Sequence, residues 1–170
     1  TEFENEFTWG KAISQNTTDE FHKKFEKAVD EAKREFGKKY PLIINGKEIY
    51  SENTFSLNSP SDKQIIIGEF PKATISNTND AISSAKNAFA RWSNLSYLKR
   101  AKIFRECADY FSSRKFFFAA IMSFENGKNR FEAMGDIDEA IDFMRFYALQ
   151  LEKNNGFCKN TYHPNPHEKT

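Results

Sequence analysis

The segment from residue 130 to residue 153 most constrains what this chain can fold into, because it carries two different sides at helical spacing. Gly135, Glu139, Asp142 and Phe146 share one side, with Phe143 at its flank. The opposite side is a continuous apolar stripe, typical of the buried face of an amphipathic helix: Ile137, Ala140, Ile141, Met144, Tyr147, Ala148 and Leu151. The stripe accounts for the helix. The aromatic residues on the other side are therefore either scattered surface residues or are covered by something else.

Apolar residues at helical spacing predict further helices along most of the chain. The first spans residues 18 to 36, with Thr17 and Glu20 placed as a capping box. Further helices follow from an apolar face over residues 81 to 92, from a segment capped by Ser96, and from a buried run that ends at Asn126-Gly127. In the segment after Ser96, the apolar side is formed by Leu98, Ala101, Phe104, Ala108 and Phe111.

Two short antiparallel β-hairpins are predicted between the first and second helices. Asn45-Gly46 separates two apolar runs and favours a type I′ turn, because both residues tolerate positive φ. A second pair of strands is expected to turn at residues 59 to 62. We therefore expect an amino-terminal arm over residues 1–17, a mostly helical body over residues 18–153 and an extended tail over residues 154–170.

Composition limits the classes of partner and compartment. Lys and Arg number 25 and Asp and Glu number 24, so there is no electrostatic reason to expect nucleic acid or an anionic membrane as a partner. The longest nearly apolar run, residues 116 to 124, is far shorter than the roughly 20 residues that span a bilayer. Two cysteines without framework spacing favour reduced thiols, and a cytoplasmic location is expected.

The candidate catalytic and metal-binding residues are weak. The glycines form neither GxGxxG nor GxxxxGK[ST], and His22, the only histidine outside the tail, is expected on a solvated helix position. Cys107 is expected to be a buried, inert thiol. The tail residues Cys158, His163 and His167 are zinc-compatible in type, but prolines hold that stretch extended and no fourth ligand is evident, so incidental residues are favoured.

Acidic residues gather near the last helix. They could in principle hold a hard cation or form an acid/base pair, but the spacing favours a solvated acidic face with Asp142 pairing to Arg145. The residues concerned are Glu125, Glu132, Asp136, Asp138, Glu139 and Asp142. The residues alone therefore predict a helical domain with two hairpins and no visible active site.

Several stretches, taken in order, resemble the amino-terminal part of aldehyde dehydrogenases, and more narrowly the 1-pyrroline-5-carboxylate dehydrogenase family. The stretches that carry the resemblance are YPLIINGKEI (40–49), LNSPSD (57–62), IIIGEFPKAT (65–74), NDAISSAKNAFARWSN (79–94), KRAKIFRECADYF (99–111), FENGKNRFEA (124–133) and EAIDFMRFYALQLE (139–152). Two turns depart from the family pattern: Asn129 stands where a proline is usual, and Ser59 separates an otherwise adjacent Asn-Pro pair.

The resemblance implies an α/β fold of the aldehyde dehydrogenase type, of which this chain is the amino-terminal part of the cofactor-binding half. The implied reaction is attack of a cysteine thiolate on glutamate semialdehyde, hydride transfer to NAD(P) and hydrolysis to glutamate in proline catabolism. The family's catalytic and nucleotide-binding residues match no position here, so catalytic, cofactor-binding and metal residues are expected to be none. The segment itself is expected to be inactive without the remainder of its own chain.

The resemblance also gives the second side of the last helix a role. The position of Glu139 lines the substrate entrance in the family, with Gly135 one turn before it and Phe143 one turn after it. A homo-oligomer with a small aldehyde substrate is implied for the full-length enzyme. A free-standing helical protein-interaction module, using Phe143 and Phe146 to hold a partner, is the alternative.

Overall fold

The computed structural model describes residues 5–157, which fold mostly into helices. The helices are α1 (Thr8–Ser14), α2 (Thr18–Lys33), α3 (Ile75–Ser93), α4 (Tyr97–Ser113), α5 (Lys115–Asn126) and α6 (Arg130–Lys153), followed by the short 3-10 turn η1 (Asn155–Phe157). The strands are β1 (Lys38–Lys39), β2 (Leu42–Ile44), β3 (Lys47–Ile49), β4 (Thr54–Asn58) and β5 (Ile66–Pro71). None of the helices in this part of the chain is long and apolar enough to cross a membrane.

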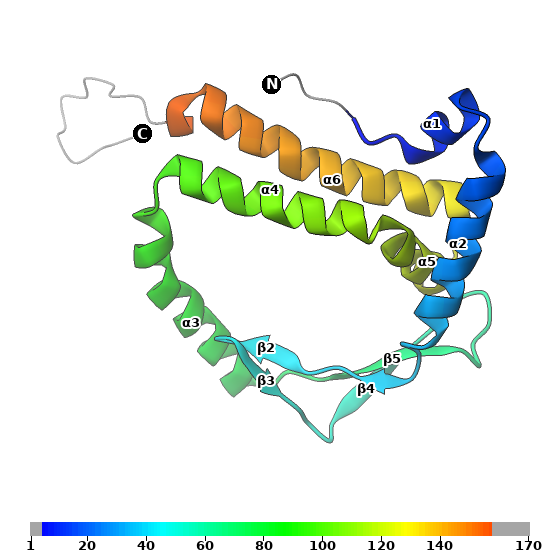
Figure 1. Cartoon of the computed structure of the whole chain (residues 1–170). Coiled ribbons are helices and arrows are strands. Elements are labelled where there is room, and N and C mark those ends of the chain that lie inside the picture. Colours follow the sequence, from blue (N-terminus) through cyan, green and yellow to red (C-terminus); the bar gives the residue numbers. More distant parts are fainter. Residues whose placement is uncertain (1–4, 158–170) are drawn as a thin grey trace.

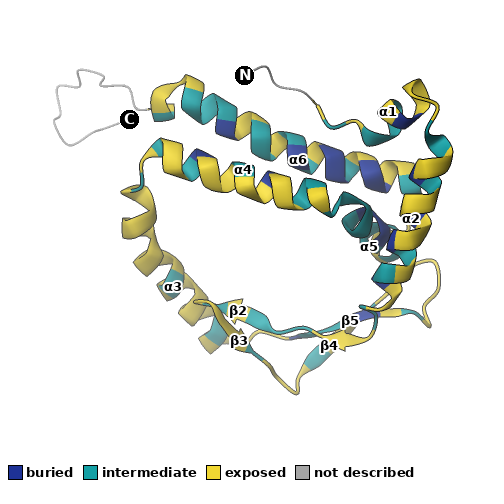
Figure 2. Cartoon of the chain, viewed as in Figure 1, coloured by how far each residue is buried: buried dark blue, intermediate teal, exposed yellow. Residues whose placement is uncertain are grey.

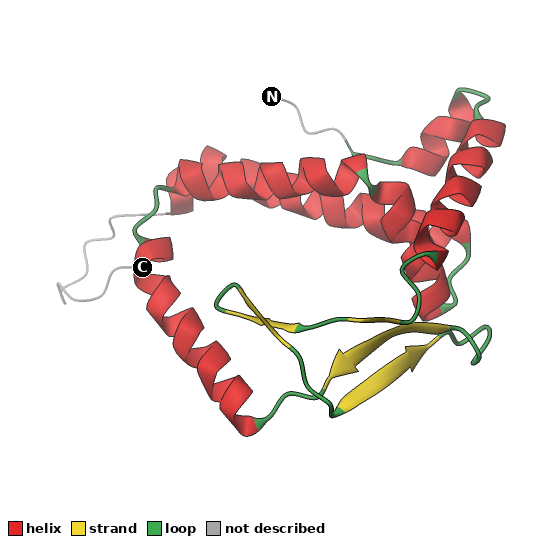
Figure 3. Cartoon of the chain, turned by 60° about the horizontal axis from the view of Figure 1, so that its bottom comes forward, coloured by secondary structure: helices red, strands yellow, loops and turns green. Residues whose placement is uncertain are grey.

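The long helices α4 and α6 lie side by side, and α2 and α5 pack at one end of this pair (Figure 1). The strands lie apart from the body formed by α2, α4, α5 and α6, and α3 extends away from this helical body (Figure 3). The helical body and the small sheets are thus separate regions. Helix α2 leads from the body to the strands, and α3 leads from the strands back to the body.

The apolar core lies where α1, α2, α5 and α6 meet (Figure 2). On α2, Phe21, Phe25, Ala28 and Ala32 recur at helical spacing and are buried. Alanines at the facing positions of α5 and α6 allow the helix backbones to approach closely, and Met134 and Ile141 fill the space between them. The predicted stripe of α6 is confirmed at Ile137, Ile141 and Ala148 but is wrong at Tyr147, which is exposed.

The two predicted hairpins are present, together with one strand that was not predicted. Asn45 and Gly46 both have positive φ, 53° and 71°, and join β2 to β3. The second pair, β4 and β5, is antiparallel, and β1 adds to β5 in parallel through residues such as Lys38, paired with Gly68. Strand β1 was not predicted because a strand of two residues that pairs with a distant segment is too short to show a hydrophobic periodicity.

Most predicted helix ends are confirmed. The Ser96 hydroxyl accepts a hydrogen bond from Lys99 N–H at 3.3 Å, and Gly127 ends α5 with φ of 73°. Asn129, at the position where the family usually has proline, caps α6 by accepting from the N–H groups of Phe131 and Glu132 at 3.0 Å. Asparagine therefore supplies a stabilising side-chain cap at this turn.

The capping box predicted at Thr17 is wrong. Its side chain makes no capping hydrogen bond, and its backbone is not extended. The reason is that α1, which was not predicted, directly precedes it: Thr17 N–H donates to the carbonyl of Ala12 at 2.9 Å and so closes α1. The arm therefore contains a helix, and its Trp9 packs against Phe21 and Phe131 with ring centroids 5.0 and 4.3 Å apart.

Helix α3 has an apolar face but no buried residue (Figure 2). Ile82, Phe89 and Trp92 are exposed along it. Helix α4 is similar. Its only buried residues are Ala101 and Ala108, while Leu98 and Phe104 on its apolar side are exposed. An apolar helix face without a packing partner usually marks a contact with another body.

Because tertiary packing contributes little to α3, its stability is expected to depend on its amino-terminal cap. Thr74 and Asn77 form a capping box: Thr74 Oγ1 accepts from Asn77 N–H at 3.1 Å, and Asn77 Oδ1 accepts from Thr74 N–H at 3.0 Å. Thr74→Ala should cost about 1 kcal/mol and speed amide hydrogen exchange in α3 about fivefold. Hydrogen exchange followed by mass spectrometry checks this, with α4 peptides as the internal control. Unchanged exchange in α3 would show that the helix is held by other contacts.

Candidate functional site

The side of α6 opposite its buried apolar stripe borders a hollow of about 320 Å³. The hollow is lined by Asn5, Glu139, Asp142, Phe143 and Phe146. Two of the three predicted entrance residues, Glu139 and Phe143, therefore line one hollow. Gly135 is exposed on the same helix but is not among the lining residues, and a Cβ atom at its position would meet no atom outside its own stretch of helix within 4 Å.

The aromatic residues of this side are open to solvent. Phe143 is 49% exposed, and its ring stacks on Tyr147 at 5.9 Å between centroids. Tyr147, expected in the buried stripe, is 59% exposed because it faces an apolar groove of about 440 Å³ between α4 and α6. The groove is lined by Ala101, Phe104, Tyr147, Ala148, Gln150, Leu151 and Phe157.

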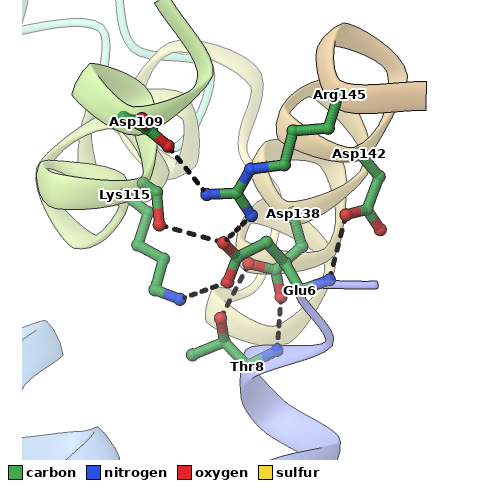
Figure 4. Close-up of polar contacts among 8 residues, drawn as sticks. Glu6, Thr8, Asp109, Lys115, Asp138, Asp142 and Arg145 are labelled. Atoms are coloured by element: carbon green, nitrogen blue, oxygen red, sulfur yellow. Dashed lines mark hydrogen bonds and ion pairs between the residues drawn. The ribbon is translucent and has the colours of Figure 1, made fainter. Parts of the chain in front are cut away.

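A strap formed by residues 5 to 8 is held by two acidic residues of α6, Asp138 and Asp142 (Figure 4). Its first residue, Asn5, lines the hollow described above. The Glu6 carboxylate accepts hydrogen bonds from three elements: the Ser112 hydroxyl of α4 at 2.9 Å, Lys115 Nζ of α5 at 2.9 Å and Arg145 Nη1 of α6 at 2.6 Å. Charge-assisted hydrogen bonds of this kind are stronger than neutral ones. One carboxylate therefore joins three helices.

The backbone of the strap is fixed as well (Figure 4). Glu6 N–H donates to Oδ1 of Asp142 at 3.0 Å. Thr8 donates its N–H to Oδ2 of Asp138 at 2.6 Å and its hydroxyl to Oδ1 at 2.7 Å. Asp138 thus accepts two hydrogen bonds from Thr8 at the start of α1. Its carboxylate acts on α1 much as an N-cap side chain would, although it comes from another helix.

The half-buried carboxylate of Glu6 and the buried carboxylate of Asp138 have opposite pKa shifts. Burial by itself would raise the pKa of Glu6, but the hydrogen bonds from Lys115, Arg145 and Ser112 outweigh it and lower the pKa to about 2. Burial raises the pKa of the Asp138 carboxyl, and the hydrogen bonds from Thr8 offset only part of that rise. The difference follows from the partners: Glu6 faces two cations, whereas Asp138 faces neutral donors.

The expected solvated acidic face is confirmed at Glu125, Glu132 and Glu139, which are exposed, and is wrong at Asp138 and Asp142. Asp138 is buried, and Asp142 accepts from the strap, whereas Arg145 pairs with Glu6 and with Asp109 at 3.3 Å. Sequence reasoning missed Glu6, because its partners on α6 lie more than 130 residues away. No local spacing could have shown this arrangement.

The other candidate residues do not assemble into a site. Cys107, predicted to be buried, is exposed, and the buried residues of α4 are its alanines Ala101 and Ala108. His22, predicted to be solvated, is half-buried between Trp9 and Phe131, with Nδ1 3.0 Å from Arg130 Nη1. Cys158, His163 and His167 lie outside the described residues. Within residues 5–157, no group of His, Cys, Asp or Glu could hold a metal ion.

The amino terminus of α3 does not fit the phosphates of a dinucleotide. The amino terminus of a helix that follows a strand is the usual place for them. Helix α3 follows β5, but Thr74 and Asn77 already occupy its end through the capping box. No glycine lies between β5 and α3 to let a pyrophosphate approach the backbone.

Comparison with known proteins decides the family. The sequence profile of the aldehyde dehydrogenase family matches residues 47–169. The chain belongs to the aldehyde dehydrogenase family. Among curated aldehyde dehydrogenases, it is 38% identical over 140 residues to 1-pyrroline-5-carboxylate dehydrogenase of Oceanobacillus iheyensis, covering 81% of this chain and 27% of that protein. It is 33% identical over 150 residues to the Staphylococcus aureus protein of the same name, covering 88% and 28%.

A solved aldehyde dehydrogenase has the same fold over this segment. The 1-pyrroline-5-carboxylate dehydrogenase from Thermus, determined with bound NAD, matches with a TM-score of 0.79 and 28% identity over 86% of this chain and 28% of that one. The chain thus spans about a quarter of the length of the curated aldehyde dehydrogenases it matches, which agrees with the expected amino-terminal part of the family fold.

Proposed function

We propose that these residues form the amino-terminal part of a 1-pyrroline-5-carboxylate dehydrogenase, an enzyme that oxidises glutamate semialdehyde to glutamate with NAD(P) in proline catabolism. The observation that carries the proposal is the match to relatives of that name along most of this chain. In this proposal the full-length enzyme is a cytoplasmic homo-oligomer. The catalytic and cofactor-binding residues belong to the remainder of the enzyme, and the inactivity of residues 1–170 alone stays a prediction.

The exposed apolar faces support a contact with that remainder. Helix α3 has no buried residue, and α4 exposes Leu98 and Phe104, so both faces are available to a further layer of the same chain. In a fold of packed layers, helices of this kind cover a sheet. We place the rest of the aldehyde dehydrogenase on these faces.

Glu139, Phe143 and Gly135 are proposed to border the substrate entrance. Glu139 and Phe143 line the same hollow, and a carboxylate beside an aromatic ring suits a substrate that carries an ammonium group. Gly135 lies one turn before Glu139 on the same helix and is exposed. The charge of Glu139 would then favour glutamate semialdehyde over neutral aldehydes.

The first test is the activity of the complete gene product that contains these residues. We expect NADH to form, followed at 340 nm, when pyrroline-5-carboxylate and NAD are supplied. Failure to oxidise any aldehyde would contradict the proposal and favour the alternative of a helical interaction module that uses the exposed aromatic side of α6.

The second test concerns Glu139 alone. In the full-length enzyme, Glu139→Gln should raise KM for glutamate semialdehyde about tenfold, because the substrate ammonium loses a charged partner. KM for a neutral aldehyde such as propanal should change little. Steady-state kinetics with both aldehydes measure the ratio, and Glu132→Gln on the first turn of the same helix is the matched control. An unchanged ratio would reject the entrance role.

A further inference from the structure

The hollow beside Glu139 has two walls that come from opposite ends of the chain. One wall is α6, which supplies Glu139, Asp142, Phe143 and Phe146. The other is the strap, which supplies Asn5. The hollow is therefore not a property of α6 alone, and its shape depends on where the strap lies.

The strap is fixed immediately after Asn5. The N–H of Glu6 donates to Asp142, a residue that itself lines the hollow. The side chain of Glu6 is only 12% exposed and accepts from Lys115 and Arg145 (Figure 4). A position held by hydrogen bonds to three helices has little freedom, so Asn5 stays at the rim of the hollow.

We propose that Asn5 contributes to substrate selection at this entrance, and that Glu6 is the positioning residue that holds it there. The inference rests on the proposed function, in which the hollow beside Glu139 is the substrate entrance. The amide oxygen of Asn5 can accept a hydrogen bond from an ammonium group, and its NH₂ can donate to a carboxylate. Glutamate semialdehyde carries both groups, whereas a simple aliphatic aldehyde carries neither.

Glu6 has a second effect on the same hollow. Its carboxylate binds Arg145, which lies about one turn beyond Asp142 on α6. Without the carboxylate of Glu6, the guanidinium would remain near the hollow with Asp109 as its acidic partner. A less neutralised cation beside the entrance would disfavour the substrate ammonium.

The test uses the full-length enzyme with three variants of the strap. Asn5→Ala removes both hydrogen-bonding groups from an exposed position and leaves the hydrogen bonds of the Glu6 carboxylate in place. Asn5→Asp keeps an acceptor oxygen. Glu6→Gln removes the charge that holds the strap. Glu152→Gln is the matched control, because Glu152 pairs with Arg105 and so joins α6 to α4 at the other end of α6. For each variant, kcat and KM are measured with glutamate semialdehyde and with propanal.

We expect Asn5→Ala and Glu6→Gln to raise KM for glutamate semialdehyde about threefold to tenfold, with kcat within about twofold and KM for propanal unchanged. Asn5→Asp keeps the acceptor for the ammonium group but loses the donor to the carboxylate, so its KM should lie between those of the parent enzyme and Asn5→Ala, and Glu152→Gln should leave KM unaltered. Equal losses with both aldehydes, or a fall in kcat alone, would overturn the inference and leave the strap a structural brace.

The outcome for Glu139→Gln distinguishes a failure of the entrance role from a failure of the role of the strap. If Glu139→Gln changes the ratio of KM values but neither Asn5→Ala nor Glu6→Gln does, the entrance is correct and the role of the strap is wrong. If Glu139→Gln also leaves the ratio unchanged, the hollow is not the entrance, and both fail together.

Discussion

Replacing Phe21 by alanine is expected to lower the free energy of unfolding by about 3 to 5 kcal/mol, the usual cost of removing a buried phenylalanine ring. Phe21 is 3% exposed on α2, and its ring contacts Trp9 of α1, Phe116 of α5 and Phe131 of α6 with centroids 5.0 to 6.1 Å apart. The substitution would therefore leave a cavity where four helices meet.

The matched control is Phe89→Ala on α3, where the ring is 66% exposed. This substitution should change the unfolding free energy by about 0.5 kcal/mol or less, because little apolar area is buried there. Urea denaturation followed by circular dichroism measures both values. Comparable losses at the two positions would contradict the burial pattern described here. In the full-length enzyme, by contrast, a larger cost at Phe89 is expected, since the proposed function places other parts of the chain on that face.

The second large effect is expected at Glu6 and depends on pH. The pKa of Glu6 is about 2 in the folded chain, below its ordinary value of 4.5. A carboxyl with a depressed folded pKa stabilises the fold above its unfolded pKa, and the stabilisation is lost as pH falls toward the folded pKa. The difference corresponds to about 2 to 3 kcal/mol, present in full above roughly pH 5 and absent near pH 2.

Glu6→Gln should remove this contribution. At pH 7 the variant is expected to be less stable by about 2 to 3 kcal/mol, since Lys115 and Arg145 lose a charged partner in a half-buried site. The gap between the two proteins should narrow as pH falls from 5 toward 2. Denaturation curves across this range measure the gap, and a constant difference would show that the Glu6 carboxylate does not titrate as described.

Asp138 acts in the opposite sense. Its pKa is raised in the folded chain, so the folded carboxyl binds its proton more tightly than the unfolded one. Its contribution favours the fold at low pH and declines as pH rises through the folded pKa. Burial, the largest cause of this rise, acts in both proteins, so comparing the parent chain with Glu6→Gln cancels that part, whereas the smaller part caused by the Glu6 charge is lost in the variant.

Local sequence patterns predicted the elements whose signals lie within a few residues. Ser96, Asn126-Gly127 and Asn45-Gly46 each specify a cap or a turn through their own backbone preferences and nearby hydrogen bonds. Where two elements compete for one residue, the same reasoning failed. Thr17 has the residue type of a cap, but closure of α1 uses its backbone and sets its conformation.

Burial was predicted less well than secondary structure, because periodicity shows that a helix has an apolar side and not whether anything covers it. The apolar face of α3 follows the same spacing as that of α2, yet only α2 is buried. Tyr147 and Cys107 were assigned to buried sides on the same grounds and are exposed. A pattern of apolar residues therefore predicts a contact face whose partner can lie outside the described residues.

The order of α2 to α6 and of the two hairpins, the caps at Ser96 and Gly127 and the two-sided character of α6 were determined by the sequence itself, since each depends on neighbours within one or two helical turns. Only the tertiary structure decided that Glu6 joins α4, α5 and α6, that Asp138 is buried against Thr8, and that Asn5 shares a hollow with Glu139. The physical reason is distance along the chain. A carboxylate can bind any cation or N–H that the fold brings to it, and the choice is made only when the backbone has placed them together.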